Sequence, residues 1–304
     1  MKKTKLLLVG IFAAFCGLQA QQLPLYSQYM LNDFSMNPAV AGTQSYFNVK
    51  SDNRFQWMGI TDAPRTYILT FDGPINPQHI GIGCYVFTDI TGPTRRTGFT
   101  TTYSYHMKLT NDLNLSFGIS AGILQFAVDG QAITVITQND QALLTQFQSA
   151  IVPDFGAGAY LYGSKFYFGI AAPQVVPMNA KINSYSNAQD IMVTHLYATG
   201  GYNFDLGNNF SVDPCIVAKY VYPAPPQFDL GARVLYEQKF WLGAGYRTLD
   251  AAYAMIGYVY QKNLTFGFSY DYSVTDIHKY SSGTTEFYIG VRFNKHKSPD
   301  HPMM

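Results

Sequence analysis

Hydrophobic and polar residues alternate one by one along much of the chain. The segment NLTFGFSYDYS, residues 263–273, shows this pattern most clearly. Its apolar residues are Leu264, Phe266, Phe268, Tyr270 and Tyr272, and they are separated by Thr265, Gly267, Ser269 and Asp271. Because successive side chains of a β-strand point to opposite faces, this segment forms a strand with one apolar and one polar face. The same period recurs in residues 99–109, 113–125, 227–237 and 286–294. The chain is therefore predicted to be all-β.

Segments of this kind predict about fourteen antiparallel strands, if each strand has the ~9–11 residues that a tilted transmembrane strand requires. Their expected first residues are Ser45, Arg65, His79, Arg95, Asp112, Asp154, Lys165, Asp190, Asn209, Gln227, Lys239, Ala251, Asn263 and Thr284. Minimal turns such as Gly163-Ser164 alternate with long loops such as residues 129–153 and 175–189. Outer-membrane barrels have short periplasmic turns and long extracellular loops. An even strand number then returns both termini to the periplasm.

Composition separates a membrane barrel from a soluble β-sandwich, which also shows alternation. Charged residues are only 13% of the chain, against about 25% in ordinary soluble domains. Aromatic residues reach 16%, and several tyrosines fall near expected strand ends, as in the aromatic girdles of outer-membrane barrels. A net charge of +1 gives no electrostatic reason to expect nucleic acid as a partner. We therefore predict a multi-pass β-barrel in the outer membrane, with lipid around its apolar face.

The first twenty residues have the features of a secretory signal peptide. Lys2, Lys3 and Lys5 precede an apolar run that is too short to span a bilayer as a helix, and small residues lead to a cleavage site after Ala20. Cys16 would allow lipidation instead, but Phe15 before it is bulky for that processing. The expected organisation is a signal peptide (1–20), an N-terminal periplasmic or plug segment (21–44), the barrel (45–295) and a periplasmic tail (296–304).

The stretch after the signal peptide does not follow the barrel pattern. Tyr26, Tyr29, Met30 and Phe34 fall at i, i+3, i+4 and i+8, which predicts one or two amphipathic helical turns that end before Pro38. Such a short segment has to bury its apolar face against something else. It either folds into the lumen as a plug or meets a periplasmic partner, and we favour the plug. The candidate plug residues are Tyr26, Tyr29, Met30, Phe34, Asn37 and Pro38.

The sequence contains few residues in patterns that would support catalysis or metal binding. The six histidines are scattered without ligand spacing, and the one Gly-x-Ser-x-Gly match, at residues 118–122, lies within the alternating segment 113–125 and not at a turn from a strand into a helix. We expect no enzymatic activity, no metal and no cofactor. By the alternation Cys84 points outward and Cys215 inward, which predicts two free thiols. The expected inward charges of both signs are balanced, which argues against an ion-selective ring. Residues 139–150 are expected to form a short extracellular helix over the barrel mouth.

Residues 54–64 (RFQWMGITDAP) are predicted to cap the first hairpin outside the cell. Trp and Arg dominate contact energies at protein interfaces, and Pro64 stiffens the loop. The candidate partner-binding residues are therefore Arg54, Gln56, Trp57 and Pro64. Trp57 could instead serve only as a residue of the aromatic girdle.

Two motifs resemble the N-terminal signature of a known family. YSQYMLNDFSMNPAVAG followed by NRFQWMGITDAPRTYILTFDGPI is similar to the PorP/SprF outer-membrane proteins of the Bacteroidetes type IX secretion and gliding motility system. The matching pieces are Tyr26-Ser27-Gln28-Tyr29, Asn37-Pro38-Ala39, Ala41-Gly42, Arg54, Gln56-Trp57 and Ala63-Pro64.

The resemblance implies a non-enzymatic protein that supports secretion or cell-surface attachment of large secreted proteins, such as gliding adhesins. It implies two kinds of partner. One is a secreted surface protein with a type IX secretion signal domain, and the other is the periplasmic secretion-motor components. It does not separate a core secretion component from a dedicated partner of one surface protein. The alternative is a passive outer-membrane channel or transporter for small solutes, because fourteen strands lie between filled eight-stranded barrels and open sixteen-stranded porins.

Overall fold

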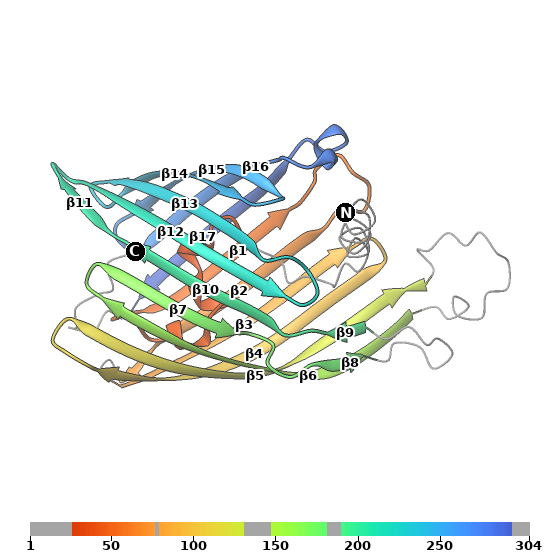
Figure 1. Ribbon diagram of the computed structural model, residues 1–304, viewed down its shortest axis with the longest axis horizontal. Helices are drawn as coiled ribbons and strands as arrows, with labels where there is room; N and C mark the ends of the chain where they lie inside the picture. Colours follow the sequence, from red (N-terminus) through yellow and green to blue (C-terminus); the bar gives the residue numbers. More distant parts are fainter. Residues whose placement is uncertain (1–25, 77–78, 131–146, 181–189, 294–304) are drawn as a thin grey trace, which may run out of the picture.

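The computed structural model describes residues 26–76, 79–130, 147–180 and 190–293. In this part of the chain fourteen antiparallel strands close into one barrel, which confirms the predicted fold class (Figure 1). Among the described residues no helix is long and apolar enough to cross a membrane. The expected signal peptide and C-terminal tail lie outside the described residues, as does the first part of the expected helix 139–150.

The strands follow the chain in order around the barrel. They are β1 Phe47–Phe55, β2 Arg65–Asn76, β3 Ile80–Thr91, β4 Thr94–Lys108, β5 Leu113–Asp129, β6 Phe147–Gly163, β7 Phe166–Ala172, β8 Met178–Ala180, β9 Asp190–Met192, β10 His195–Tyr202, β11 Phe204–Gly207, β12 Phe210–Val221, β13 Gln227–Tyr236, β14 Phe240–Arg247, β15 Ala251–Tyr260, β16 Leu264–Ser273 and β17 Thr284–Phe293. Strands β8 and β9 pair only with each other as a separate ribbon, and β11 continues β10 after Asn203.

The barrel closes at one place, where its first and last strands meet. Strand β1 pairs with β17 from Phe47↔Phe293 to Phe55↔Thr285. The remaining neighbours pair in chain order, and β10 meets β12 from His195↔Val221 to Gly201↔Cys215. Each barrel strand therefore has a partner on both sides, so no edge is left to expose unpaired backbone groups to lipid.

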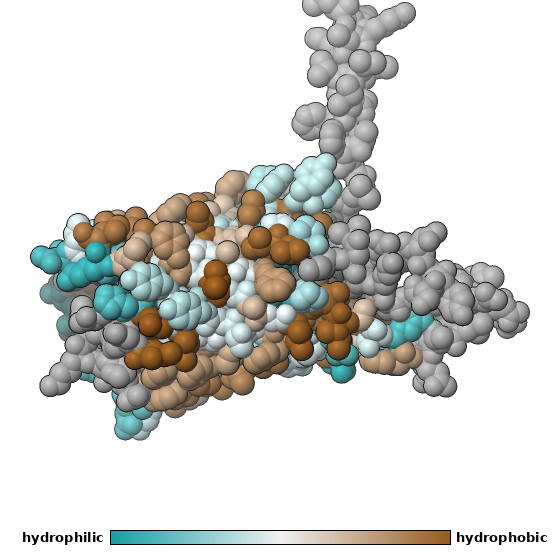
Figure 2. Space-filling view, turned by 90° about the horizontal axis from the view of Figure 1, so that it is seen from below, coloured by the Kyte–Doolittle hydropathy of each residue, from teal (hydrophilic) through white to brown (hydrophobic). Residues whose placement is uncertain are grey.

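The predicted lipid and lumen faces are those of the structure. On β16, Phe268 is 36% exposed whereas its neighbour Ser269 is 0% exposed. The outward residues of the other strands are likewise large and apolar, and they cover much of the side of the barrel in Figure 2. The inward face carries most of the buried polar residues. This is the apolar-out, polar-in arrangement of an outer-membrane barrel.

Residues 26–46 lie inside the barrel, and we call them the plug segment. It forms three short 3-10 helices, η1 Tyr29–Leu31, η2 Asp33–Ser35 and η3 Pro38–Val40. The first two lie where helical turns were expected, and η3 was not expected. Asn37 explains the last interruption, because its backbone is extended and its side chain accepts a hydrogen bond from the Ala39 N–H. In Figure 1 the segment, drawn in red, lies between the walls of the barrel. A further 3-10 helix, η5 Asp276–Lys279, lies in the loop before β17.

Two strand predictions were wrong, for β6 and for the eighth strand of the barrel. Strand β6 begins at Phe147 instead of near Asp154, so residues 147–150 are a strand and not the end of a helix. They extend the ladder with β5, whose last residue Asp129 faces Phe147. Pro153 interrupts the sequence pattern there without ending the strand. The eighth barrel strand was expected near Asp190, but that residue belongs to the separate ribbon, and β10 begins at His195.

Depth in the membrane should decide the cost of an outward charge. Phe268 lies in the middle of β16, so Phe268→Arg is expected to destabilise the barrel by about 2–4 kcal/mol. Phe240 is also outward but is the first residue of β14, so Phe240→Arg should cost only about 0–1 kcal/mol. Urea unfolding in lipid bilayers measures both values. Equal costs would show that the two residues do not differ in depth.

Candidate functional site

The plug segment begins on a pair of carboxylates in the barrel wall. The backbone N–H groups of Ser27 and Gln28 donate to Glu286 on β17, at 2.9 and 2.8 Å. The Ser27 hydroxyl donates to Asp271 on β16 at 2.6 Å. The Gln28 side chain also donates to the Glu286 backbone carbonyl at 3.2 Å. Because hydrogen bonds to a carboxylate are stronger than neutral ones, these contacts fix the first residues of the segment to the wall.

Two arginines neutralise these carboxylates from other strands. Arg54 on β1 contacts Asp271 at 2.8 Å and Glu286 at 2.9 Å, and it donates to the Ser27 hydroxyl at 3.1 Å. Arg247 on β14 donates to the same hydroxyl at 3.0 Å and pairs with Asp229 on β13 at 2.9 Å. All of these charged side chains are almost fully buried. Ser27 is therefore held by charged side chains from β1, β14, β16 and β17, which are strands on both sides of the β1–β17 pairing.

The middle of the plug segment contacts the wall through isolated polar bonds. The Tyr29 hydroxyl lies 3.2 Å from the Cys215 sulfur, and Thr70 donates to the Asn32 side chain at 3.1 Å. Tyr160 donates to Asp33 at 3.4 Å. Burial raises the pKa of the Asp33 carboxyl above its ordinary value, against the opposing charge of Lys50. These bonds satisfy polar groups that would otherwise be costly to bury.

The last part of the plug segment packs directly on the backbone of the wall. Ser116 donates to the Ala39 carbonyl at 2.6 Å, and Ser104 donates to the Ala41 carbonyl at 2.6 Å. Inward glycines permit this closeness. A Cβ at Gly118 would collide with the Ala39 backbone nitrogen, and one at Gly158 would collide with the Asn37 side chain. The inward glycines that alternate with apolar residues in β5 and β6 therefore leave the space that η3 occupies.

The six candidate plug residues all lie inside the barrel and are buried. Tyr29 and Met30 belong to an apolar cluster with Tyr253 and Trp241 of the wall. Phe34 belongs to a second cluster with Tyr160 and Tyr167. Asn37 donates to the Ala159 carbonyl at 3.1 Å. The segment thus makes both apolar and polar contacts with the wall inside the lumen.

The placement of Arg54 in an exposed loop was wrong. Arg54 lies in β1 with its side chain inward and 3% exposed. It faces Glu286 directly across the β1–β17 ladder. The reason is the alternation itself, because Asn48, Lys50 and Asp52 are inward and Arg54 continues their register. Arg54 therefore anchors the plug segment and is not available to an outside partner.

The other three candidates lie in the loop between β1 and β2, which neighbouring loops hold in place. Met58 and the β16–β17 loop exchange backbone hydrogen bonds, from the Met58 N–H to Gly283 at 2.8 Å and from the Ser282 N–H to Met58 at 2.7 Å. The Gln56 N–H donates to the Pro64 carbonyl at 2.9 Å, which closes the loop on itself. We call residues 56–64 the anchored loop.

Trp57 is half-buried in the anchored loop and has an unusual backbone conformation. Its φ of 50° lies in the left-handed region, and its N–H donates to the Thr284 hydroxyl at 3.1 Å. A residue other than glycine in a sparsely populated conformation costs roughly 1–3 kcal/mol and is retained where the surroundings hold it. Tyr280, 76% exposed, lies on the neighbouring loop, and its backbone carbonyl is near Gly59. Two aromatic side chains are thus presented on a fixed backbone.

Sequence reasoning missed four residues that anchor the plug segment. They are Ser27, Arg247, Asp271 and Glu286. The charged three had been assigned to the inward face, but only as balanced charges. The sequence did indicate that these charged residues are paired. Buried charges of both signs in a lumen without net charge have to form specific ion pairs. Their partner in the plug could not be identified, since the pairing depends on how the barrel closes.

Comparison with known proteins adds a family and a fold. Residues 18–291 match the family model described as type IX secretion system membrane protein PorP/SprF. No curated protein matches the sequence. The toluene transporter TbuX of Ralstonia pickettii has a TM-score of 0.50 at 12% identity, over 88% of this chain and 93% of that chain. A FadL homologue of Pseudomonas aeruginosa has a TM-score of 0.46 at 11% identity, over 90% and 95%. At such identities the likeness concerns the outer-membrane barrel fold alone.

Proposed function

Because this chain belongs to the PorP/SprF family of type IX secretion system membrane proteins, we propose that it supports the secretion or cell-surface attachment of large secreted proteins. The barrel fold and the family place it in the outer membrane. In this proposal it acts without enzymatic chemistry and without a cofactor. Its partner is a secreted surface protein that carries a type IX secretion signal domain, and periplasmic components of the secretion motor are a second class of partner.

The observation that carries the proposal is the plug segment packed inside the lumen. The plug segment is hydrogen-bonded to the wall at its start, middle and end, and its residues are almost all buried. A passive channel for small solutes needs a continuous open path through the lumen, and the plug segment lies in that path. The function is then carried by the outer surfaces of the barrel. The packed plug segment therefore favours a role in binding other proteins over the channel alternative.

The anchored loop is the surface that we assign to the partner. With both termini in the periplasm, the anchored loop and the β16–β17 loop face outside the cell, where a secreted protein emerges. Aromatic side chains on a preordered backbone bind at low entropic cost, because the loop does not have to be ordered on binding. Gln56 and Pro64 close the loop, and Trp57 and Tyr280 supply the contact area.

Trp57→Ala tests this assignment. A hot-spot tryptophan contributes about 2 kcal/mol or more to a protein interface, so the secreted partner should be lost from the cell surface and found in the medium or degraded. The barrel should remain folded in the outer membrane, because Trp57 lies in the loop between β1 and β2 and belongs to no strand. Surface labelling of the partner and heat-modifiable mobility of the barrel measure the two outcomes.

Tyr222→Ala is the matched control. Tyr222 is 74% exposed and follows the end of β12, so it is an exposed aromatic side chain on a different connection. Surface display should be normal in this variant. Normal surface display in Trp57→Ala as well would show that the anchored loop does not belong to the partner-binding site. A growth defect on a single solute, with normal display, would favour the channel alternative.

A further inference from the structure

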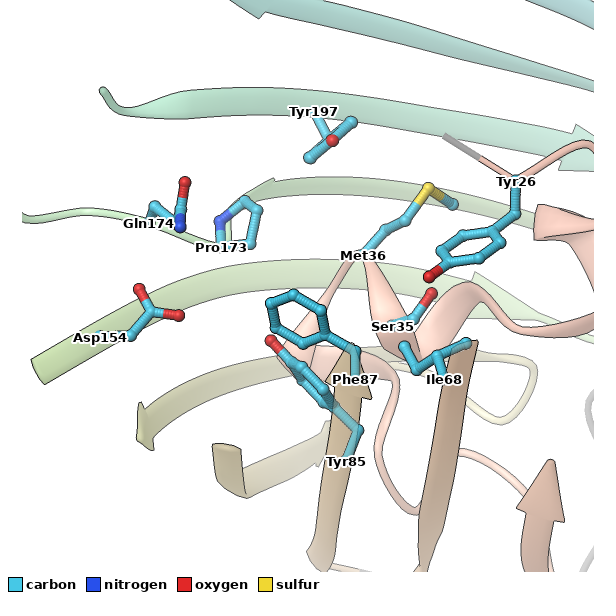
Figure 3. A pocket seen from close by; sticks show the side chains of 10 residues that line it. All are labelled: Tyr26, Ser35, Met36, Ile68, Tyr85, Phe87, Asp154, Pro173, Gln174 and Tyr197. Carbon is cyan, nitrogen blue, oxygen red and sulfur yellow. The ribbon is translucent and has the colours of Figure 1, made fainter. Parts of the chain in front are cut away.

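A cavity of about 50 Å³ lies between the plug segment and the barrel wall (Figure 3). The plug contributes Tyr26 and Met36, and the wall contributes Tyr85, Phe87 and Tyr197. Phe87 lies near the end of β3 that leads away from the short β2–β3 connection, so the cavity is on the long-loop side of the plug. The volume is enough for a headgroup of a few heavy atoms and too small for a folded segment.

One carboxylate at this cavity has no counter-charge. Asp154 on β6 is only 7% exposed, and its Oδ1 atom is buried without a hydrogen-bond partner within the described part of the chain. No lysine, arginine or histidine in the same part of the chain forms an ion pair with it. Figure 3 shows Asp154 at one end of the cavity and Tyr26 at the other, with Met36, Phe87 and Tyr85 between them. The buried acids that hold the plug, in contrast, are paired with arginines.

A buried carboxylate of this kind costs stability unless a ligand completes it. The aromatic rings that line the cavity beside Asp154 supply further contacts that attract a cation. Tyr85 and Phe87 point inward from the same strand, with ring centroids 6.3 Å apart. The faces of such rings attract cations, and the attraction grows when water is excluded. A thioether from Met36 and the ring of Tyr197 add apolar contact without adding charge.

We propose that this cavity binds the ammonium group of a ligand on a short aliphatic body, with Asp154 as its counter-ion and the aromatic rings around the methylene or methyl groups. Two kinds of ligand carry such an ammonium group, namely a free organic ammonium ion and a lysine side chain of a bound protein. The site does not depend on the secretion role, since it is built from the lumen wall and the plug and not from the anchored loop.

Titration calorimetry of the whole protein in an uncharged detergent tests the site. The probes are choline, its neutral isostere 3,3-dimethylbutan-1-ol, and N-acetyl-lysine methylamide. At least one ammonium probe should bind about tenfold or more tightly than the neutral isostere, as expected for a desolvated cation beside a carboxylate and aromatic rings. A preference for choline identifies a free ammonium ion as the ligand type, and a preference for the lysine probe identifies a protein side chain. Equal binding of the neutral isostere, or no binding of either ammonium probe, would overturn the proposal.

Two variants of the cavity and one control on the lipid face separate ligand binding from folding. Asp154→Asn should weaken ammonium binding about tenfold or more while leaving the thermal midpoint of the empty protein unchanged or higher, because it removes an uncompensated buried charge. Phe87→Leu should weaken binding severalfold, and Phe99→Leu on the lipid face should leave it unchanged. Full binding in Asp154→Asn, or a lowered midpoint with unchanged binding, would show that Asp154 has only a structural role.

Discussion

Arg54→Ala is expected to destabilise the folded protein by about 3–5 kcal/mol, the cost typical of removing one member of a buried ion pair. The Arg54 guanidinium contacts both Asp271 and Glu286 within 2.9 Å, and both carboxylates are at most 1% exposed. Truncation would leave them buried with Arg247 as their remaining cation, 3.6 Å from Asp271. Urea unfolding of the protein in detergent micelles measures the loss.

Arg95→Ala is the matched control for this prediction. Arg95 is exposed near the beginning of β4 and forms no ion pair with the rest of the described chain. Its truncation should change stability by no more than ~0.5 kcal/mol. Arg54→Lys should recover only part of the loss, because a lysine cannot hold two carboxylates with the planar fork of a guanidinium. Equal stability of the two alanine variants would contradict the role of Arg54 as an anchor.

The barrel was predictable because one physical rule acts along the whole chain. Lipid outside and polar groups inside force a period of two on every strand, as in Phe266, Phe268 and Tyr270 against Thr265 and Ser269. Most strand starts fell close to their predicted places, after long loops as well as short turns, as at Arg65 and Thr284. The start of β6 was missed although its exposure still alternates from Phe147 onward, and the β8–β9 ribbon was missed because its two strands are only three residues each.

The contents of the lumen were less predictable than its wall. The motif around Tyr26 and Asn37 indicated a segment apart from the strands, and its burial is consistent with that reading. Its shape was not evident, because 3-10 turns depend on the wall they pack against, as η3 does on Gly118. The alternation through Lys50 and Asp52 already placed Arg54 inward. Arg54 was nevertheless assigned to the loop together with Trp57, because Arg and Trp are both common at protein interfaces.

Removal of the plug segment should have the largest functional effect. Deletion of Tyr26–Ala41 from the otherwise complete chain is expected to change a blocked barrel into an ion-conducting one. The fourteen-stranded wall lies between filled eight-stranded barrels and open sixteen-stranded porins. Its inward face is polar and can be hydrated once the segment is gone. The wall ion pairs Arg54–Glu286 and Arg247–Asp229 do not include the plug, so the barrel should still close.

The control for the deletion is Trp57→Ala, which changes the anchored loop and leaves the plug segment in the lumen. Trp57→Ala should show no steady conductance in a planar bilayer, like the unaltered protein, even though it no longer displays the partner on the cell surface. A deletion variant that no longer shows heat-modifiable mobility would indicate that the plug is needed for closure of the barrel.

Single-channel recording in planar bilayers is the most direct test of whether this barrel is closed by its own N-terminal segment. We predict no steady conductance from the unaltered protein and stable, voltage-independent channels from the variant that lacks Tyr26–Ala41. Steady channels of the same size from both proteins would contradict a filled lumen, and with it the preference for protein binding over solute conduction.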